Sequence, residues 1–250
     1  MLREAAAMVI VRDTNKGVEV CMLRRVEQSR FAAGAYVFPG GAVDRQDSQL
    51  NPCLFNSTES ADQLLLTHYK VAALREAFEE AGLLASSVPA DMVVNGRLRE
   101  KLQQNDISFE QVLDQLNVSI KFENIIFYDH WITPEGAPIR FDTRFFLSTV
   151  GSGQELIHDD KETDQSCWVQ AAEVLTLYDQ GKVKLMPVTH VQLKRLSYFN
   201  SVSQLIDYAK KEVNIKPTLP VLNYDSSGKP ISVNIDLPEG QVEYPTFRKT

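Results

Sequence analysis

The chain has 250 residues, of which 44% are hydrophobic and 24% charged, and its formal net charge is −7. This composition is typical of a globular protein with a full hydrophobic core, and the length suits one elaborated domain or two small ones. The negative charge argues against a general binder of nucleic-acid backbones. The N-terminus lacks a signal-peptide pattern and no apolar run reaches membrane-spanning length. We therefore expect an intracellular, cytoplasmic protein with neither nucleic acid nor membrane as a partner.

The first half of the chain is predicted to form a strand hairpin, a third strand and then helices. Apolar periodicity and turn signals predict strands over 5–12 and 18–23, joined by a turn at 15–17, and a strand within 31–44 that runs into a Pro39-Gly40-Gly41 turn. A loop over 44–60 follows. The next predicted elements are a helix over about 61–81 and two amphipathic helices between 91 and 116. Ser60 and Gln63 stand at capping-box spacing for the long helix.

The second half mixes strands and helices without strict βαβ alternation. The predicted elements are strands over 124–133, 140–150 and 166–169, helices over 171–178, 190–199 and 202–211, and a Pro-rich tail with a hairpin at 225–228. This pattern indicates the α+β class, with a sheet covered by helices on both faces.

Three glutamates gather near the end of the long helix. Glu76, Glu79 and Glu80 stand at i, i+3 and i+4 and so share one helix face, while Gly82 is expected to end the helix. Negative charge is unfavourable at this end of the helix dipole, and like charges at this spacing repel by roughly 0.2–0.5 kcal/mol per pair. The cluster is either a solvated acidic face or a site for a divalent cation, whose charge would remove the repulsion.

The residues around this helix resemble the Nudix box, whose pattern is G-x5-E-x7-R-E-U-x-E-E-x-G-U with U an apolar residue. Gly41 matches the first glycine, and the second half matches at Arg75, Glu76, Ala77, Glu79, Glu80, Gly82 and Leu83. The middle departs from the pattern: Asp47 replaces the first glutamate, and the 27 residues of 48–74 stand where the pattern has seven. Another acid, such as Glu59 or Asp62, could fill the place of that glutamate, or none could.

A stretch before the box resembles the one in Nudix enzymes that act on coenzyme A. Arg25, Arg30, Gly34 and the Phe38-Pro39-Gly40-Gly41 run keep that spacing, although Cys21-Met22-Leu23 and Val26 replace its Leu-Leu-Thr and its small residue. The interrupted box and the segments WITPEG, RFDTRFF and LMPVTHVQLKRLSYFNSV are similar to the peroxisomal acyl-coenzyme A diphosphatases and their bacterial relatives. A peroxisomal location is not expected, because the chain ends in Phe247-Arg248-Lys249-Thr250 and not in an SKL-type tripeptide.

The resemblance implies a single Nudix domain over residues 1–250, built as an α/β/α sandwich around a mixed sheet. Relative to a minimal Nudix core, an insertion at about 48–67 splits the box, helices are inserted at about 91–116, and a helical extension occupies about 188–250. The inserted helices have an apolar face, which either walls the open end of the site or packs against the core or a partner subunit.

The resemblance also implies hydrolysis of a diphosphate linkage with Mg²⁺ or Mn²⁺ as the cofactor. Glu79 and Glu80 would be the firm metal ligands, and Glu76 a further ligand or the general base. Arg75 would orient a box carboxylate. Gly40 and Gly41 would provide close backbone approach and unusual φ/ψ angles for the loop before the helix.

Other candidate residues rest on weaker patterns. Arg25 and Arg30 could bind the phosphates of coenzyme A, since guanidinium groups suit phosphate oxygens, or they could be surface charges. Glu162 precedes a predicted strand where related enzymes often carry an additional acid, so it is either a ligand or base, or part of a solvated acidic loop. Arg140, Asp142 and Arg144 share one face of a strand and are expected to form an ion-paired row.

Three functions remain open from the sequence. The first is a diphosphatase that converts coenzyme A or its thioesters into 3′,5′-ADP and (acyl-)4′-phosphopantetheine. The second is a Nudix hydrolase acting on ADP-ribose, NADH or another nucleoside diphosphate derivative, and the third is a Nudix-fold binding module without catalysis. The complete Glu76, Glu79 and Glu80 set favours an enzyme. The partner is thus a small-molecule substrate, and assembly as a homodimer is left open.

Overall fold

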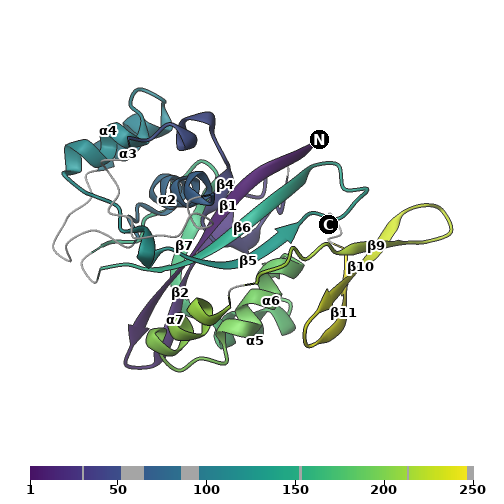
Figure 1. The fold of residues 1–250 in the computed structure, drawn as a ribbon. Coiled ribbons are helices and arrows are strands. Elements are labelled where there is room, and N and C mark those ends of the chain that lie inside the picture. Colours follow the sequence, from purple (N-terminus) through teal and green to yellow (C-terminus); the bar gives the residue numbers. More distant parts are fainter. Residues whose placement is uncertain (30, 52–64, 86–95, 152–153, 213, 247–250) are drawn as a thin grey trace.

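Two β-sheets and six α-helices make up the part of the chain that the structure, a computed structural model, describes (Figure 1). The described residues are 1–29, 31–51, 65–85, 96–151, 154–212 and 214–246. Within them, no helix is both long and apolar enough to cross a membrane.

The main sheet is mixed and has eight strands. These are β1 (Leu2–Thr14), β2 (Gly17–Arg25), β3 (Ala35–Val37), β4 (Gly40–Ala42), β5 (Ile126–Ile132), β6 (Arg140–Thr149), β7 (Thr163–Gln170) and β8 (Lys184–Leu185). The order is β5-β6-β1-β2-β3-β8, with β4 paired to β1 and β7 paired to β2. The β1–β6 and β3–β8 pairs are parallel, whereas the other pairs are antiparallel.

The long strand β1 is the centre of the fold because both of its faces are buried. Its run Ala5–Val11 is apolar throughout, as expected for a strand covered on two sides. Ala6, Met8 and Ile10 pack in the core beneath the helix that carries the box, while Ala7, Val9 and Val11 face the opposite core. Because successive side chains of β1 point to opposite faces of the sheet, this one strand contributes residues to both hydrophobic cores.

Helices cover the two faces of the sheet as predicted, which confirms the α/β/α arrangement (Figure 1). One face carries α2 (Thr67–Ala81), α3 (Gly96–Gln103) and α4 (Phe109–Leu116), and the other carries α5 (Ala171–Asp179), α6 (Pro187–Leu196) and α7 (Val202–Lys211). Short 3-10 turns lie at Arg45–Ser48 and Phe122–Asn124. The proposed caps of the long helix, Ser60 and Gln63, lie outside the described residues.

A helical extension was predicted over about 188–250, but within the described residues the helices end at Lys211. Beyond it, β9 (Val221–Tyr224), β10 (Pro230–Leu237) and β11 (Gly240–Pro245) form a separate antiparallel sheet, seen in yellow beside α6 in Figure 1. The predicted hairpin at 225–228 joins its first two strands. Ile235 is fully buried against the core on the α5–α7 face, so the small sheet extends that layer.

Candidate active site

The box helix α2 delivers the three glutamates to the edge of the sheet beside β4. Its buried face is rich in alanine and carries Phe78, so the helix approaches the sheet closely. It ends at Gly82, which has the left-handed φ of 71° and donates its N–H to the carbonyl of Phe78. Glu79 and Glu80 therefore lie in the last turn, as the sequence predicted.

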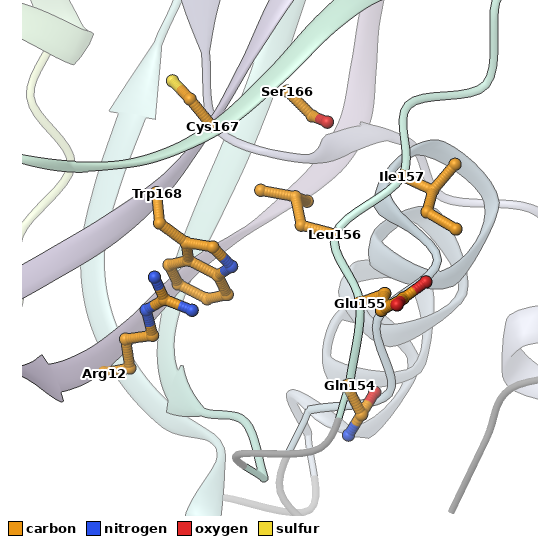
Figure 2. Close-up of a pocket in the computed structure, with 8 residues that line it drawn as sticks. All are labelled: Arg12, Gln154, Glu155, Leu156, Ile157, Ser166, Cys167 and Trp168. Carbon is orange, nitrogen blue, oxygen red and sulfur yellow. The ribbon is translucent and has the colours of Figure 1, made fainter.

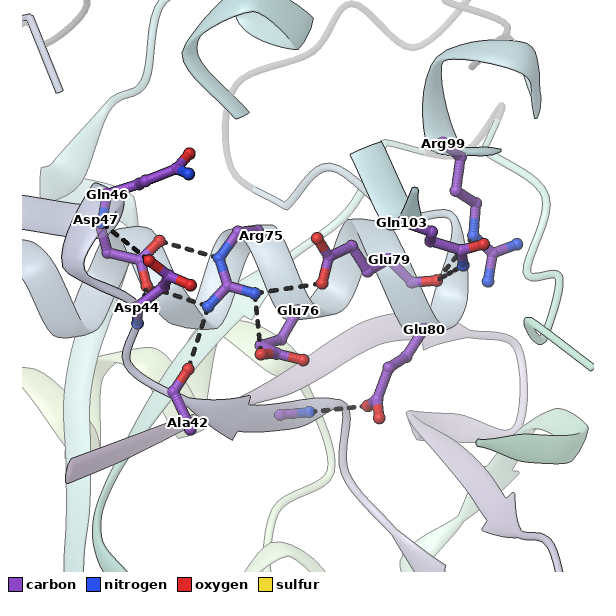
Figure 3. Close-up of polar contacts among 11 residues, drawn as sticks. Ala42, Asp44, Gln46, Asp47, Arg75, Glu76, Glu79, Glu80, Arg99 and Gln103 are labelled. Atoms are coloured by element: carbon purple, nitrogen blue, oxygen red, sulfur yellow. Dashed lines mark hydrogen bonds and ion pairs between the residues drawn. The ribbon is translucent and has the colours of Figure 1, made fainter. Parts of the chain in front are cut away.

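The guanidinium of Arg75 is the hub of the site (Figure 3). It binds both carboxylate oxygens of Asp47, with Nε–Oδ1 and Nη2–Oδ2 distances of 2.9 Å. Its Nη1 donates to Glu76 at 2.9 Å and to Glu79 at 3.1 Å, and its Nη2 also donates to the carbonyl of Ala42 at 3.0 Å. Arg75 thus contacts three carboxylates of the box, and the orienting role predicted for it rests on these contacts and stays a prediction.

Asp47 reaches Arg75 because residues 44–48 fold into a capped 3-10 turn where the sequence suggested only a loop. The side chain of Asp44 accepts from the N–H of Gln46, and the N–H of Asp44 donates to the Asp47 carboxylate at 2.7 Å. Asp47 is 2% exposed, and the guanidinium of Arg75 is its ion-pair partner in the interior. Asp47, which stands where the box pattern has its first glutamate, thus lies against the box arginine despite the insertion. The alternatives Glu59 and Asp62 lie outside the described residues.

The chain bends at Pro39 as predicted, but the two glycines that follow form strand β4 and are not part of a turn. Neither has a positive φ, and both pair with β1. Close approach is nevertheless essential: a Cβ on Gly40 would lie 2.6 Å from the carbonyl oxygen of Ala6, and one on Gly41 would lie 2.6 Å from Oε1 of Glu76. The N–H of Gly40 also donates to Glu80 at 3.0 Å.

Burial raises the pKa of all three box glutamates. Desolvation raises the pKa of Glu76 to about 7, although Arg75 opposes the shift. The pKa of Glu79 is also raised by burial, against the pull of Arg75. Glu80 is 4% exposed, and its pKa is raised well above the usual value by burial and by Glu76.

The carboxylates of Glu76, Glu79 and Glu80 are oxygen donors of the kind that a hard divalent cation prefers. Their raised pKa values show that the neighbouring arginine does not fully offset the cost of burying their charges. The side chains are not arranged as ligands, however. Among the described residues, no three His, Cys, Asp or Glu side chains form a cluster able to hold a metal ion. Arg75 Nη1 bonds both Glu76 and Glu79, and Glu80 binds the Gly40 N–H. Metal ligation by the three glutamates therefore stays a prediction.

Arg25 and Glu162 come together at the end of β2, within electrostatic range of Glu80. Their side chains are 3.4 Å apart, the N–H of Val26 donates to the Glu162 carbonyl, and both charges act on Glu80. Glu162 is largely exposed, whereas Nε of Arg25 is buried and forms no hydrogen bond within the described residues. Arg30 lies outside those residues.

A cavity of about 460 Å³ lies beside Arg75 and Glu79. Its opposite wall is formed by residues 105–111, which are the turn between α3 and α4 and the first residues of α4. Leu98 and Leu102 of α3 are 8% and 5% exposed and pack in the core. The apolar face of these helices therefore packs against the core, which was one of the two predicted roles, and their connecting turn lines the cavity beside Arg75. Whether that cavity receives part of a substrate stays a prediction.

A second hollow, of about 360 Å³, lies between β7 and residues 154–157 (Figure 2). Arg12 stacks on the ring of Trp168 there, with 4.4 Å between the guanidinium and the ring centroid, and pairs with Glu19. None of the site residues predicted from the sequence lines this hollow. The row on β6 is ion-paired in part: Asp142 contacts Arg144 at 2.7 Å, whereas Arg140 donates to the carbonyl of Thr133.

Two residues of the site escaped the sequence analysis. Arg99 and Gln103 of α3 both donate to the backbone carbonyl of Glu79, at 2.9 and 2.7 Å (Figure 3). No motif marks them, because their partner is a main-chain atom some twenty residues away. Arg99 places a positive charge at the helix end that carries Glu79 and Glu80, and Gln103 adds a neutral hydrogen bond.

Comparison with known proteins covers most of the chain. The sequence profile described as "NUDT19 Nudix domain" matches residues 50–196. A Caenorhabditis elegans protein provisionally named nudix hydrolase 7 is 29% identical over 78% of this chain and 60% of its own length. The Xenopus laevis acyl-coenzyme A diphosphatase NUDT19 is 24% identical over 75% of this chain and 62% of that protein. The chain thus spans about three fifths of the length of these relatives.

A solved structure matches more completely. The NUDIX hydrolase of Alicyclobacillus acidocaldarius superposes with a TM-score of 0.73 at 27% identity, over 83% of this chain and 96% of that protein. The shared fold agrees with the mixed sheet between two helical layers described above. The chain belongs to the Nudix hydrolase family, and within it to the NUDT19 type.

Proposed function

We propose that this protein hydrolyses the diphosphate linkage of coenzyme A or its thioesters, with Mg²⁺ or Mn²⁺ as the cofactor. Water adds to one phosphorus and the bridging P–O bond breaks, which releases 3′,5′-ADP and 4′-phosphopantetheine or its acyl form. The observation that carries the reaction type is the carboxylate cluster of Glu76, Glu79 and Glu80 on a Nudix box helix. The substrate rests on relatives that are named acyl-coenzyme A diphosphatases.

Each residue at the site has a distinct proposed role. Glu79 and Glu80 would hold the cation, with Glu76 as a further ligand or as the base that takes a proton from water. When bound, a divalent cation neutralises phosphate charge and lowers the pKa of water. Arg75 keeps the carboxylates in place through the contacts it makes with Asp47, Glu76 and Glu79.

Arg25 is proposed to contact a substrate phosphate. It lies beside Glu80 and Glu162, and its buried Nε has no partner among the described residues. A buried donor left unpaired costs about 1–3 kcal/mol, which a phosphate oxygen could recover. Glu162, exposed on the neighbouring loop, is proposed as an additional acid at the same phosphates.

The cavity beside Arg75 is proposed to receive the pantetheine arm or the acyl chain. Its wall carries Asp106 and Glu110, which repel a phosphate, together with Ile107 and Phe109, which suit an uncharged chain. The cytoplasmic location and any homodimer stay predictions from the sequence.

The test is a substrate panel with identified products. Coenzyme A, an acyl-coenzyme A, ADP-ribose, NADH and a diadenosine polyphosphate are each incubated with the protein and Mg²⁺ or Mn²⁺. We expect 3′,5′-ADP and (acyl-)4′-phosphopantetheine as main products, with kcat lower by orders of magnitude in Glu80→Gln. Preferred hydrolysis of ADP-ribose or NADH would move the assignment to another Nudix substrate, and turnover unchanged in Glu80→Gln would contradict the site.

A further inference from the structure

The inserted helix α3 touches both the box helix and the loop that carries Glu162. Nε of Arg99 donates to the carbonyl of Glu79 at 2.9 Å, and its Nη1 donates to the carbonyl of His158 at 3.3 Å. Nε2 of Gln103 donates to the same Glu79 carbonyl at 2.7 Å, and its Oε1 accepts from Nζ of Lys161 at 3.1 Å. Two side chains of one helix thus bridge the same two elements.

The bridge formed by Arg99 and Gln103 contacts the box helix at its C-terminal end. The last carbonyls of an α-helix lack partners within the helix, and α2 ends in two acidic residues. Arg99 is 9% exposed and brings a positive charge to this end, against Glu79 and Glu80. The N–H of Ile157 binds the Ala81 carbonyl at 3.0 Å, so the loop also contacts the helix directly.

On the loop side, the bridge ends one residue before Glu162. The carboxylate of Asp159 accepts from the N–H groups of Glu162 and Thr163 and from the Thr163 hydroxyl, which fixes the turn. Lys161, held by Gln103, belongs to that turn. The position of the Glu162 backbone is therefore linked through Gln103 to the backbone of Glu79.

We propose that Arg99 and Gln103 are positioning residues that fix the Glu162 loop relative to the metal-binding end of the box helix. The proposal rests on the proposed function, because it assumes that Glu162 acts at the substrate phosphates. A helix that only covered the core would need its apolar residues alone, such as Leu98. Instead, α3 adds two polar side chains that converge on one carbonyl oxygen of the site.

The test variant is Gln103→Met, which keeps the volume of the side chain and removes both hydrogen bonds. Gln104→Met, at the next and exposed position of the chain, is the matched control. In the metal-free protein, hydrogen exchange at the amides of Ile157 and Thr163 is expected to be about tenfold faster in Gln103→Met and unchanged in the control. Lys161→Met, which removes only the loop half of the bridge, is expected to accelerate exchange at Thr163.

Kinetic measurements then distinguish positioning of Glu162 from general support of the fold. Gln103→Met is expected to lower kcat about tenfold with KM within about twofold, because a small displacement of a reacting group is costly. In a Glu162→Gln background the same change is expected to cost less than about twofold, since the residue being positioned is already disabled. Exchange and kcat equal to those of Gln104→Met, or a full tenfold loss in the Glu162→Gln background, would overturn the proposal. A wild-type protein without diphosphatase activity would instead refute the proposed function, and the exchange measurement would still decide whether the bridge exists.

Discussion

Replacing Glu76 with glutamine is expected to stabilise the metal-free protein at alkaline pH. Burial raises the pKa of the Glu76 carboxyl from 4.5 to about 7, despite the attraction of Arg75. The difference, 7 − 4.5, is about 2.5 and corresponds to about 3 kcal/mol at 1.36 kcal/mol per pKa unit. Because the folded state disfavours the ionised form, this cost is fully present above pH 7 and disappears as the pH falls towards 4.5. Glutamine resembles the protonated carboxyl and escapes the cost.

The assay is thermal or urea unfolding in a chelator at two pH values. At pH 8, Glu76→Gln is expected to gain about 3 kcal/mol, which for a domain of this size raises Tm by roughly 6–12 °C. At pH 5 the gain is expected to fall below about 1 kcal/mol. Glu100→Gln, at an exposed position on α3, serves as control and should stay within about 0.5 kcal/mol of wild type. Saturating Mn²⁺ should stabilise wild type more than the variant. Equal stability at pH 8, or a gain that persists undiminished at pH 5, would refute the electrostatic reasoning.

Three further predictions concern the contacts of Arg75, the cavity and the substrate phosphate. Asp47→Ala leaves a buried guanidinium without its main partner and is expected to cost about 3–5 kcal/mol in urea unfolding. Asp164→Ala, which breaks the more exposed ion pair with Arg24, should cost less than about 1 kcal/mol, and similar losses in the two variants would contradict the role of burial. Leu98→Ala is expected to destabilise the fold by about 2–5 kcal/mol and to lower the turnover of all acyl-coenzyme A substrates in the same proportion. Ile107→Ala, in the wall of the cavity, should change the preference between short and long acyl chains several-fold. An unchanged preference in Ile107→Ala would exclude the cavity as the acyl site. Arg30→Ala should raise KM for coenzyme A more than for dephospho-coenzyme A, and equal effects would mean that this arginine does not bind the 3′-phosphate.

Elements with strong local signals could be predicted from the sequence. The β1–β2 hairpin is set by its turn, where Gly17 takes a φ of 112°. Helix α7 matches its predicted bounds because its apolar periodicity is regular and Ser201 caps its start. The end of α2 follows from Gly82. These features depend on a few neighbouring residues, so short sequence patterns carry them.

Features that depend on distant partners could not be read from local patterns. Gly40 and Gly41 look like turn residues, yet they form a strand because β1 offers an open edge beside the box helix. The small sheet of β9–β11 forms between short segments and was recognised only as a hairpin. The bond from Asp47 to Arg75 spans the insertion, so the spacing alone left its role open.

Hydrolysis of an acyl-coenzyme A in heavy-oxygen water tests the assigned chemistry most directly. Attack at the diphosphate is expected to place one labelled oxygen on a phosphate of a single product, either 3′,5′-ADP or acyl-4′-phosphopantetheine, with the thioester intact. Chelation of the metal or the Glu80→Gln change should abolish this incorporation. Label in a free carboxylic acid together with intact coenzyme A, or labelled products formed equally well by Glu80→Gln, would contradict hydrolysis of the diphosphate at the box carboxylates.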